Sequence, residues 1–430
     1  MINETPAESG VLTRAHLRSW SWSFAGQGVQ LAVQAGSFLL LAKALPVKDL
    51  GTWVGVGALA SILGPFVAMG TGNVLIRHVS RDPAELPERW QRAVSASFWC
   101  GLAICLLAGI ACRLLLPHAA PFYVILALFI AELLVWRWTQ LIGQTLQGLH
   151  QLDRKSKLDI LVVGARGSAA LMLFSLPVGL RNLETWLAIY LGTGLLVSSV
   201  CLWRAMGVFG RPRLGAMPRW EDLREGFGFV LSPLSQTVNN DADKFLLARL
   251  ANLGSAAVYG TAYRILFAAF MPVQALLTVT YPRFFRHGRQ GIRPALRYAA
   301  AWLPGALAYS VAAGAALFAV APFLARLLGP GYADTAVIVR SLAVLPLLKA
   351  LQFFFADSLT GADFQSLRVG MQALAAVLNV ALNLILIPRY GWRGAVITTL
   401  TTDTVLALLL AACVVKLSNH QKQVPEAQAS

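Results

Sequence analysis

Apolar runs long enough to cross a membrane recur along the whole chain of 430 residues. A transmembrane helix needs about 20 consecutive residues that are mostly apolar, and the sequence contains twelve such stretches separated by short connections. We therefore predict an all-α polytopic membrane protein with about twelve transmembrane helices. The stretches begin near Trp20, Trp53, Ala93, Pro121, Leu158, Thr185, Phe229, Ser255, Tyr298, Ala336, Ser366 and Trp392.

Charged residues are too scarce for a soluble fold of this length. Only 13% of the residues are charged and 57% are hydrophobic, whereas about a quarter of the residues in soluble domains are charged. This composition excludes a soluble enzyme, a secreted disulfide scaffold and a disordered protein. The short connections also leave no room for a catalytic domain outside the membrane.

The net charge of +16, from 36 Lys and Arg against 20 Asp and Glu, has two explanations. A strongly basic chain can bind nucleic acid, and a membrane protein can concentrate Lys and Arg in its cytoplasmic loops. The basic residues lie mainly in the tails and in the connections after even-numbered stretches, so we expect both termini in the cytoplasm and no nucleic-acid partner. These connections hold Arg77, Arg81, Arg89, Arg92, Arg154, Lys155, Lys157, Arg211, Arg213, Arg219, Arg224, Arg283, Arg286, Arg289 and Arg293.

The two halves of the chain also resemble each other. The tetrapeptide that begins at Leu40 recurs 206 residues later, where it begins at Leu246, with Arg in place of Lys at its end. At the same spacing Arg77 matches Arg283. Repeats of six helices keep the same orientation in the membrane, so a pseudo-two-fold axis along the membrane normal relates them, as in many transporters that work by alternating access.

This repeat predicts two six-helix bundles, 19–206 and 228–416. A cytoplasmic linker, 207–227, joins them, and cytoplasmic tails, 1–18 and 417–430, flank them. In the linker and at its edge Trp220, Leu223 and Phe227 recur at helical spacing. That spacing fits a short amphipathic helix on the membrane surface and equally fits a solvated linker.

Polar residues line one face of two of the predicted helices. In the first stretch the face holds glutamines and serines at intervals of three and four residues, and the seventh stretch carries a similar face at the 206-residue spacing. Because lipid cannot satisfy these groups, the two faces predict a hydrated central cavity; the alternative is hydrogen bonding that holds helices together. The residues are Ser23, Gln27, Gln30, Gln34 and Ser37, then Ser232, Gln236, Asn239, Asn240 and Asp243.

Charged residues within the apolar stretches are costly and often functional. Lys244 and Arg264 can bind an anionic substrate, with Asp241 or Asp243 as a proton or cation site; a structural ion pair is the alternative. Arg137 begins a face of glutamines that descends toward the cytoplasm. The charged residues at membrane depth are Glu132, Arg137, Arg166, Asp241, Asp243, Lys244, Arg264, Lys349, Asp357 and Asp403. The residues expected to line the substrate cavity are Gln27, Gln30, Gln34, Gln236, Asn240, Lys244, Arg264 and Arg137.

No motif for cofactor or nucleotide chemistry is present. The five cysteines lie in apolar stretches and the six histidines are scattered, so we expect neither a metal site nor a cofactor. The sequence has no phosphate-binding loop of the G-x-x-x-x-G-K-[ST] type, which excludes transport driven by ATP hydrolysis within this chain.

Three blocks of sequence are typical of a known family. The blocks are Leu41 to Trp53 with Leu75-Ile76-Arg77, Asn240 to Ala248 with Tyr259 to Ile265 and Tyr281-Pro282-Arg283, and Leu378 to Ala395. In these blocks the chain resembles the oligosaccharide (O-antigen type) flippases and polysaccharide exporters of the multidrug/oligosaccharidyl-lipid/polysaccharide exporter superfamily. The resemblance implies two six-helix bundles around a cationic cavity, and transport of a polyprenyl-pyrophosphate-linked oligosaccharide across the bacterial inner membrane for surface polysaccharide biosynthesis.

Other functions remain open on the sequence. An ion-coupled small-molecule antiporter of the drug-efflux type would also use a polar cavity, and a membrane polysaccharide polymerase or ligase would also be polytopic. The expected partners are the lipid-linked oligosaccharide, membrane lipids and proteins of polysaccharide assembly. On this interpretation the chain is a transporter and not an enzyme.

Overall fold

The computed structural model describes residues 30, 33–116, 119–212, 214–215 and 220–423, and the regular secondary structure in these ranges is entirely helical. The prediction of an all-α fold is confirmed. The elements in chain order are a helix over Val33–Ala44, α2 (Val47–Val67), α3 (Thr71–Val79), η1 (Pro83–Glu85), α4 (Leu86–Leu115), α5 (Phe122–Phe129), the π-helix η2 (Ile130–Val135), α6 (Trp136–Gly148), α7 (Leu152–Ser175), η3 (Val178–Leu180), α8 (Leu183–Phe209), α9 (Trp220–Leu250), α10 (Leu253–Gly288), α11 (Ile292–Leu328), η4 (Pro330–Tyr332), α12 (Ala333–Ser341), α13 (Leu345–Gly361), α14 (Gln365–Tyr390) and α15 (Trp392–Gln423).

Nine helices among the described residues are long and apolar enough to cross a membrane, and a tenth span forms if α12 and α13, which meet at a bend of 49°, count as one. Two further segments complete the expected series. The helix over Val33–Ala44 belongs to the first stretch, whose earlier residues lie outside the described ranges. The 31-residue α9 is long enough to cross, but polar and charged side chains interrupt its apolar surface.

The helix boundaries repeat with the spacing found in the sequence. In each half a helix ends, a two-residue turn follows, and the next helix begins at the equivalent position. Helices α4 and α11, which belong to the third predicted stretch of each half, also begin at equivalent positions. The matched boundaries are Ala44 with Leu250, Val47 with Leu253, and Leu86 with Ile292.

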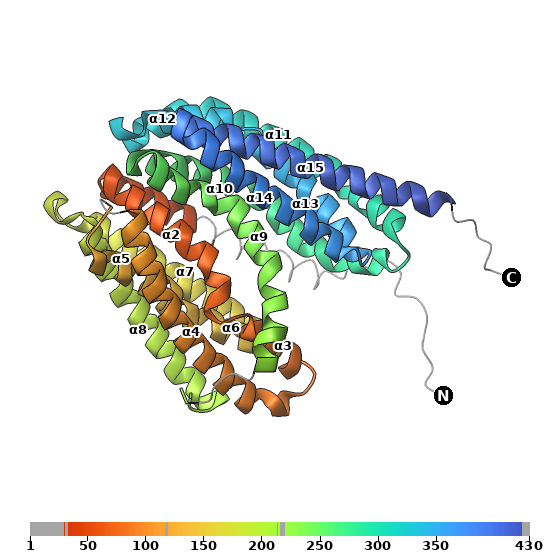
Figure 1. Ribbon diagram of the computed structural model, residues 1–430, viewed down its shortest axis with the longest axis horizontal. Coiled ribbons are helices and arrows are strands. Elements are labelled where there is room, and N and C mark those ends of the chain that lie inside the picture. The colour runs from red at the N-terminus through yellow and green to blue at the C-terminus, as the bar shows by residue number, and fades with distance from the viewer. Residues whose placement is uncertain (1–29, 31–32, 117–118, 213, 216–219, 424–430) are drawn as a thin grey trace, which may run out of the picture.

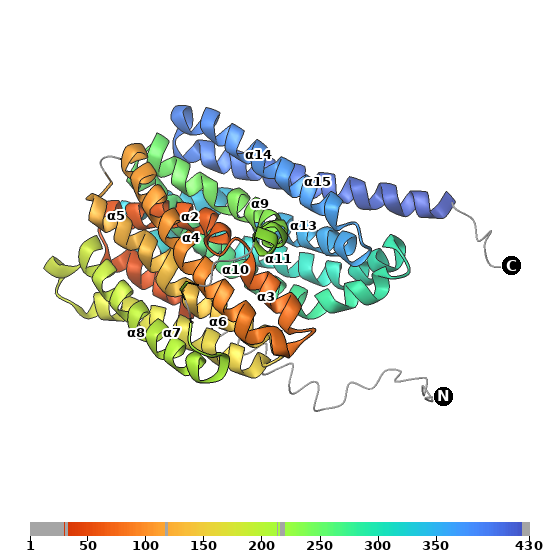
Figure 2. The ribbon, with the colours of Figure 1, turned by 60° about the horizontal axis from the view of Figure 1, so that its bottom comes forward.

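The two halves form separate groups of helices that converge at one end. Figure 1 shows α2 to α8 on one side and α10 to α15 on the other, and Figure 2 shows the same division from another direction. Helix α9 runs between the groups, from α3 at one end to α10 at the other. We call the end where α2 begins and α9 finishes the packed end, and the end that carries Arg77, Arg89, Arg154 and Arg283 the arginine-rich end.

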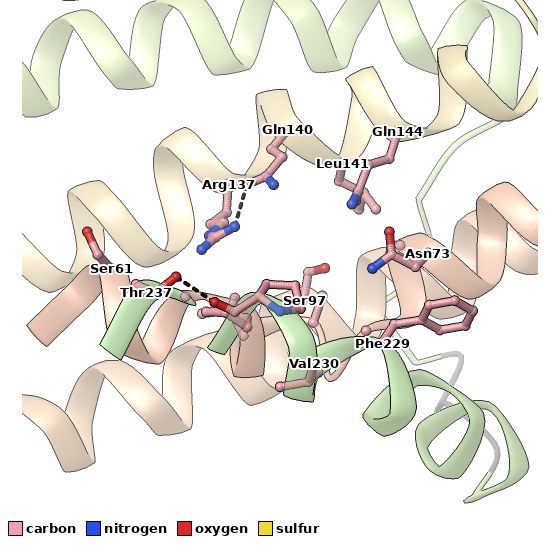
Figure 3. A pocket seen from close by; sticks show the side chains of 17 residues that line it. Ser61, Asn73, Ser97, Arg137, Gln140, Leu141, Gln144, Phe229, Val230 and Thr237 are labelled. Atoms are coloured by element: carbon pink, nitrogen blue, oxygen red, sulfur yellow. Dashed lines mark hydrogen bonds between the residues drawn. The ribbon is translucent and has the colours of Figure 1, made fainter. Parts of the chain in front are cut away.

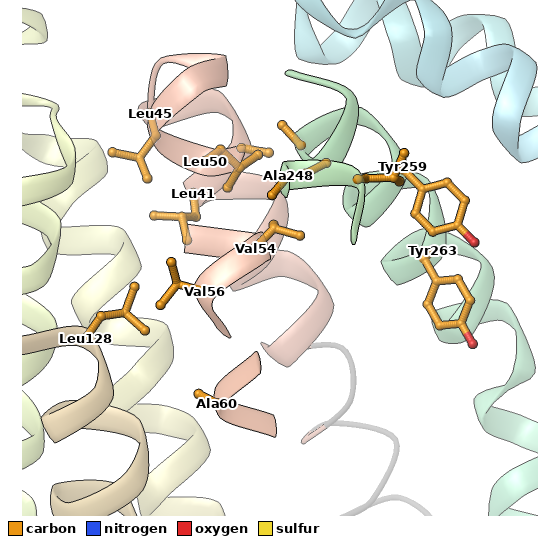
Figure 4. Close-up of a cluster of buried hydrophobic side chains, with 14 of the residues drawn as sticks. Leu41, Leu45, Leu50, Val54, Val56, Ala60, Leu128, Ala248, Tyr259 and Tyr263 are labelled. Carbon is orange, nitrogen blue, oxygen red and sulfur yellow. The ribbon is translucent and has the colours of Figure 1, made fainter. Parts of the chain in front are cut away.

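At the packed end one hydrophobic core joins both bundles. Leu50 and Val54 of α2 lie in the same buried cluster as Ala248 of α9 and Tyr259 of α10 (Figure 4). Gly51 makes the contact close, because a Cβ atom there would lie 1.9 Å from the backbone oxygen of Leu253. Only a residue without a Cβ lets the two backbones approach so closely.

At the arginine-rich end the first turns of α9 are attached to the opposite bundle by ion pairs. The buried carboxylate of Asp222 lies 2.5 Å from Arg89 and 3.3 Å from Arg92, both on α4. Glu225 pairs with Arg77 of α3 at 3.0 Å. Helix α9 therefore packs against α3 at its start, where ion pairs also join it to α4, and it packs against α2, α10 and α14 as well.

The segment expected as a linker differs from its sequence interpretation. Helix α8 continues to Phe209, and α9 begins at Trp220 instead of after the linker. Trp220 and Phe227 are exposed on its outer face, while Asp222 points inward to the arginines. The helical spacing of these residues therefore belongs to the start of α9, because its acidic face has basic partners on α3 and α4.

We expect Gly51→Ala to weaken the contact between α2 and α10. The added Cβ must displace the backbone at Leu253, and overpacking of this kind costs about 1–3 kcal/mol. Gly57 on the same helix has open space where a Cβ atom would lie, with no neighbouring atom within 4 Å, so Gly57→Ala is the matched control. The unfolding temperatures of the purified variants decide the matter; equal values would show that the backbones do not touch there.

We also expect Asp222→Asn to release the start of α9. The change leaves Arg89 and Arg92 without this carboxylate, and breaking a buried ion pair costs about 3–5 kcal/mol. Hydrogen exchange of the peptide that begins at Trp220 should become faster. Asp153→Asn, at an exposed position on α7, should leave it unchanged, and equal acceleration in both variants would contradict the assignment.

Candidate functional site

The two aspartates expected as a proton or cation site are already paired with a lysine. Lys244 Nζ lies 3.0 Å from Asp241 and 3.4 Å from Asp243. Asp243 is buried and also accepts a hydrogen bond of 2.6 Å from the Tyr259 hydroxyl. The ammonium group lies 3.8 Å from the ring centroid of Tyr263. Lys244 is therefore held within the second bundle by its neighbours.

A second ion pair extends this buried polar network. Lys349 of α13 lies 2.9 Å from Asp403 of α15 and donates to the Asn240 side chain at 3.1 Å. Gln352 donates to the same aspartate at 3.1 Å. Asn240 and Gln236 line a small cavity of about 50 Å³ next to Lys349. The polar face of α9 thus serves largely to connect helices of its own bundle.

The first bundle contains its own ion pair, partly buried, at an irregular segment. Glu132 lies in the π-helix η2, where it accepts a hydrogen bond of 2.7 Å from Tyr190 and lies 3.6 Å from Arg166 of α7. The Arg166 guanidinium stacks over Trp136 at 4.6 Å. Single π-turns within helices are often found at functional sites, and this one directly precedes Arg137.

Two arginines at membrane depth have no carboxylate partner among the described residues. Arg137 of α6 donates a hydrogen bond to Gln140 on its own helix. Arg264 of α10 is exposed, and its guanidinium lies 5.3 Å from the ring centroid of Phe38 in the first bundle. The remaining acid at depth, Asp357, pairs with Arg368 at 3.1 Å. Arg137 and Arg264 are therefore the two cations at this depth that no carboxylate among the described residues contacts, whereas Asp241 and Asp243 share the single charge of Lys244.

Arg137 lines a cavity of about 270 Å³ between the two bundles. Figure 3 shows Arg137, Gln140 and Gln144 in a row along α6, facing Asn73 of α3 and Thr237 of α9. Three of its seven polar side chains are amides, which both donate and accept hydrogen bonds. The lining residues are Ser61, Gly64, Pro65, Val67, Ala68, Gly70, Gly72, Asn73, Ser97, Arg137, Gln140, Leu141, Gln144, Phe229, Val230, Pro233 and Thr237.

Two glycines allow the polar face of α6 to approach α2 and α3. A Cβ atom at Gly64 would lie 1.7 Å from the Arg137 guanidinium, and one at Gly72 would lie 2.0 Å from the Gln144 amide. Larger residues at these positions would push the two side chains out of their present places. The sequence around α2 therefore provides room for the polar groups of α6.

The residues expected in one cavity are distributed over several places. Arg137 lines the cavity of about 270 Å³, whereas Gln236 and Asn240 line the smaller one. Lys244 is occupied by Asp241 and Asp243, so it is not a free cation for substrate. The other members are Gln30, which is half-buried, Gln34 and Arg264, which are exposed, and Gln27, which lies outside the described residues.

Several residues of the cavity had no signal in the sequence. Asn73 and Ser97 belonged to no polar face that the sequence indicated, and Thr237 lies next to Gln236 but was not on the predicted polar face of that helix. Gln140 and Gln144 follow Arg137 at helical spacing, and this spacing placed them on the same face. Lys349 and Asp403 were recognised as charges at depth, but their pairing across 54 positions is not readable from spacing.

The fold is similar to that of solved transporters. The lipid II flippase MurJ in an inward closed conformation gives a TM-score of 0.73 at 11% identity, covering 91% of this chain and 86% of that chain. A multidrug resistance MATE family transporter of the MOP superfamily gives 0.69 at 17% identity in its inward-facing conformation, with 93% and 96% of the chains covered. An outward-facing conformation of such a transporter gives 0.56 at 17% identity, with 92% and 95% covered.

Comparison of the sequence with curated proteins gives no match. Residues 16–287, more than half of the chain, match a family described as polysaccharide biosynthesis protein, and the chain therefore belongs to that family.

Proposed function

We propose that the protein is a flippase that moves a polyprenyl-pyrophosphate-linked oligosaccharide across the bacterial inner membrane. The family supports a role in polysaccharide biosynthesis. Among the described residues no connection between helices is long enough to hold a catalytic domain, which suits a transporter better than a polymerase or ligase. The excess of basic residues at the arginine-rich end supports a cytoplasmic location for that end by the positive-inside rule. The proposal accordingly has both termini on the cytoplasmic side.

The observation that carries the proposal is the pair of arginines without acidic partners. Arg137 comes from the first bundle and Arg264 from the second, and Arg264 contacts Phe38 across the boundary between the bundles. Charges at membrane depth are retained mainly where they have a function. Arginine binds phosphate oxygens through paired hydrogen bonds, so a pyrophosphate group is a ligand that suits these two arginines.

The amides beside Arg137 suit the sugar part of such a substrate. Gln140, Gln144 and Asn73 offer donors and acceptors in the same cavity, and sugar hydroxyls need both. The cavity of about 270 Å³ lies below the roughly 300–1,000 Å³ of common ligand sites. An oligosaccharide can enter only if the bundles separate further at the arginine-rich end.

Alternating access would follow from the different ways in which the ends are held. The packed end is closed by apolar side chains and backbone contact at Gly51, whereas the arginine-rich end is bridged by ion pairs of α9. Opening the packed end while closing the other would carry the bound head group to the opposite side.

A cation-coupled small-molecule antiporter is less well supported. Such a transporter needs a carboxylate that can exchange a proton or metal cation. Asp243 and Asp403, the most deeply buried acids of the second bundle, are each paired with a lysine. Among the described residues the unpaired charges at depth are basic, which favours an anionic substrate.

We expect Arg264→Gln and Arg137→Gln each to lower the transport rate tenfold or more. Loss of a charge-assisted hydrogen bond costs about 1.5–3 kcal/mol, and neither arginine holds a buried acid. Arg340→Gln is the matched control, because Arg340 also stacks on a phenylalanine, 5.1 Å from the Phe318 ring centroid, on α12 at the packed end. Flipping of lipid-linked oligosaccharide in vesicles containing each purified variant is the measurement. Wild-type rates for both glutamine variants would show that neither arginine binds the substrate.

Lys244→Met should behave differently, because it leaves Asp241 and Asp243 without their cation. Breaking a buried ion pair costs about 3–5 kcal/mol, so the amount of folded protein should fall together with transport. Adding Asp243→Asn should recover part of the folded protein. A Lys244→Met variant that folds normally but does not transport would show that Lys244 acts in the substrate site and not in holding the bundle together.

The function itself is tested by inactivating the gene and measuring lipid-linked oligosaccharide in each leaflet. We expect the intermediate to accumulate on the cytoplasmic side, and the wild-type gene, but not an Arg264→Gln copy, to restore its movement. Normal movement in the inactivated strain, in a host without a second flippase gene of this kind, would contradict the proposal.

A further inference from the structure

A cavity of about 520 Å³ opens between α6, α7 and α8 at the arginine-rich end, and the proposed transport function does not use it. We call it the α6–α8 groove. Its floor is apolar and buried, and it is formed by residues of all three helices. The floor residues are Ile142, Leu146, Leu158, Cys201, Ala205 and Phe209.

The charged residues that line the groove are all basic. Arg154 and Lys157 come from the first turns of α7, and Arg204 comes from the last turns of α8. All three are exposed, and none forms an ion pair within the part of the chain that the structure describes. Arg154 donates only to the neutral Gln151 side chain, at 2.9 Å. Three cations thus stand at the rim of an apolar cavity with no anion to balance them.

The surroundings place the groove at the edge of the membrane. Leu161 and Val208, which line it, are 47% and 57% exposed, as expected for side chains that face lipid. Trp203, next to Arg204, is 70% exposed. Tryptophan is enriched at the boundary between hydrocarbon and head groups, so the three cations lie at the level of the lipid phosphates.

We propose that the α6–α8 groove binds an anionic phospholipid. Arg154, Lys157 and Arg204 meet the head group, and an acyl chain lies along the apolar floor. Basic pockets between transmembrane helices on the cytoplasmic side bind anionic head groups in this way. The charge complementarity selects an anionic lipid over a zwitterionic one, because a neutral head group would leave the three cations uncompensated.

Helix α6 separates this groove from the cavity that holds Arg137. Leu141 lines the cavity, whereas the adjacent Ile142 lines the groove. A phospholipid in the groove therefore packs against the back of the helix whose front carries Arg137, Gln140 and Gln144. The bound lipid holds α6 in place without touching the substrate, and its binding does not depend on the proposed transport function.

Native mass spectrometry of the full-length protein tests the assignment. The delipidated protein is titrated with phosphatidylglycerol, which is anionic, and separately with phosphatidylcholine. We expect one phosphatidylglycerol to bind more tightly than any phosphatidylcholine. The triple variant R154Q/K157Q/R204Q should bind it roughly 100-fold more weakly, since each basic residue contributes about fivefold near an anionic lipid.

Two further variants separate the groove from general surface charge. R286Q/R289Q/R297Q removes three exposed arginines from α10, its end and α11 at the same end of the molecule, and it should retain the lipid. Ala205→Phe fills the floor while keeping the three cations, and it should lose the lipid although its unfolding temperature stays near that of the wild type. Should Ala205→Phe fail to fold, Leu161→Trp narrows the groove from an exposed position.

The proposal is overturned by any of three results. These are equal binding of the two lipids, equal loss of binding in both triple variants, and complete displacement of phosphatidylglycerol by inorganic phosphate, which would show that the acyl chain contributes nothing. None of these results depends on transport activity, so they leave the proposed function to its own tests.

Discussion

Charge at membrane depth has to be neutralised inside the protein, and the arrangement of the second bundle depends on how this is done. Asp243 and Asp403 are almost completely buried, and each has a lysine within 3.4 Å. Removing a charge from water costs several kcal/mol unless a partner is well placed. The helices that carry these partners, α9, α13 and α15, are therefore constrained in their rotation and height relative to one another. Arg137 and Arg264 are left without such a partner among the described residues, and this makes them candidates for binding an anionic substrate.

The way in which the bundles meet is different at the two ends. At the packed end the contact of α2 with α9 and α10 is apolar and includes backbone atoms. At the arginine-rich end the bundles are connected through the acidic first turns of α9. Separating an apolar contact exposes apolar surface to water. When an ion pair separates, its charged groups can instead be hydrated or can bind other charged groups. The second kind of contact suits the side from which a charged head group enters.

Local periodicity made much of the fold predictable. Apolar runs indicated the helices, and the repeat at Leu40 and Leu246 indicated equivalent boundaries that the structure shows at Val47 and Leu253. The roles of the polar residues were less accessible, because they depend on rotation about helix axes and on partners far away in the chain. Asp241 and Lys244 were recognisable as neighbours on one helix, but Lys349 and Asn240 meet only in the folded bundle. The sequence therefore indicated which residues had to be buried without indicating which of them remained free for a ligand.

Helix α9 begins on one bundle and continues in the other, and Pro233 lies between these two attachments. Proline removes one backbone hydrogen bond and favours bending at its position. Movement of one bundle relative to the other must then bend α9 near Pro233. The length of α9 between its two attachments, together with the shape of the cavity, therefore limits how far the arginine-rich ends of the two bundles can separate.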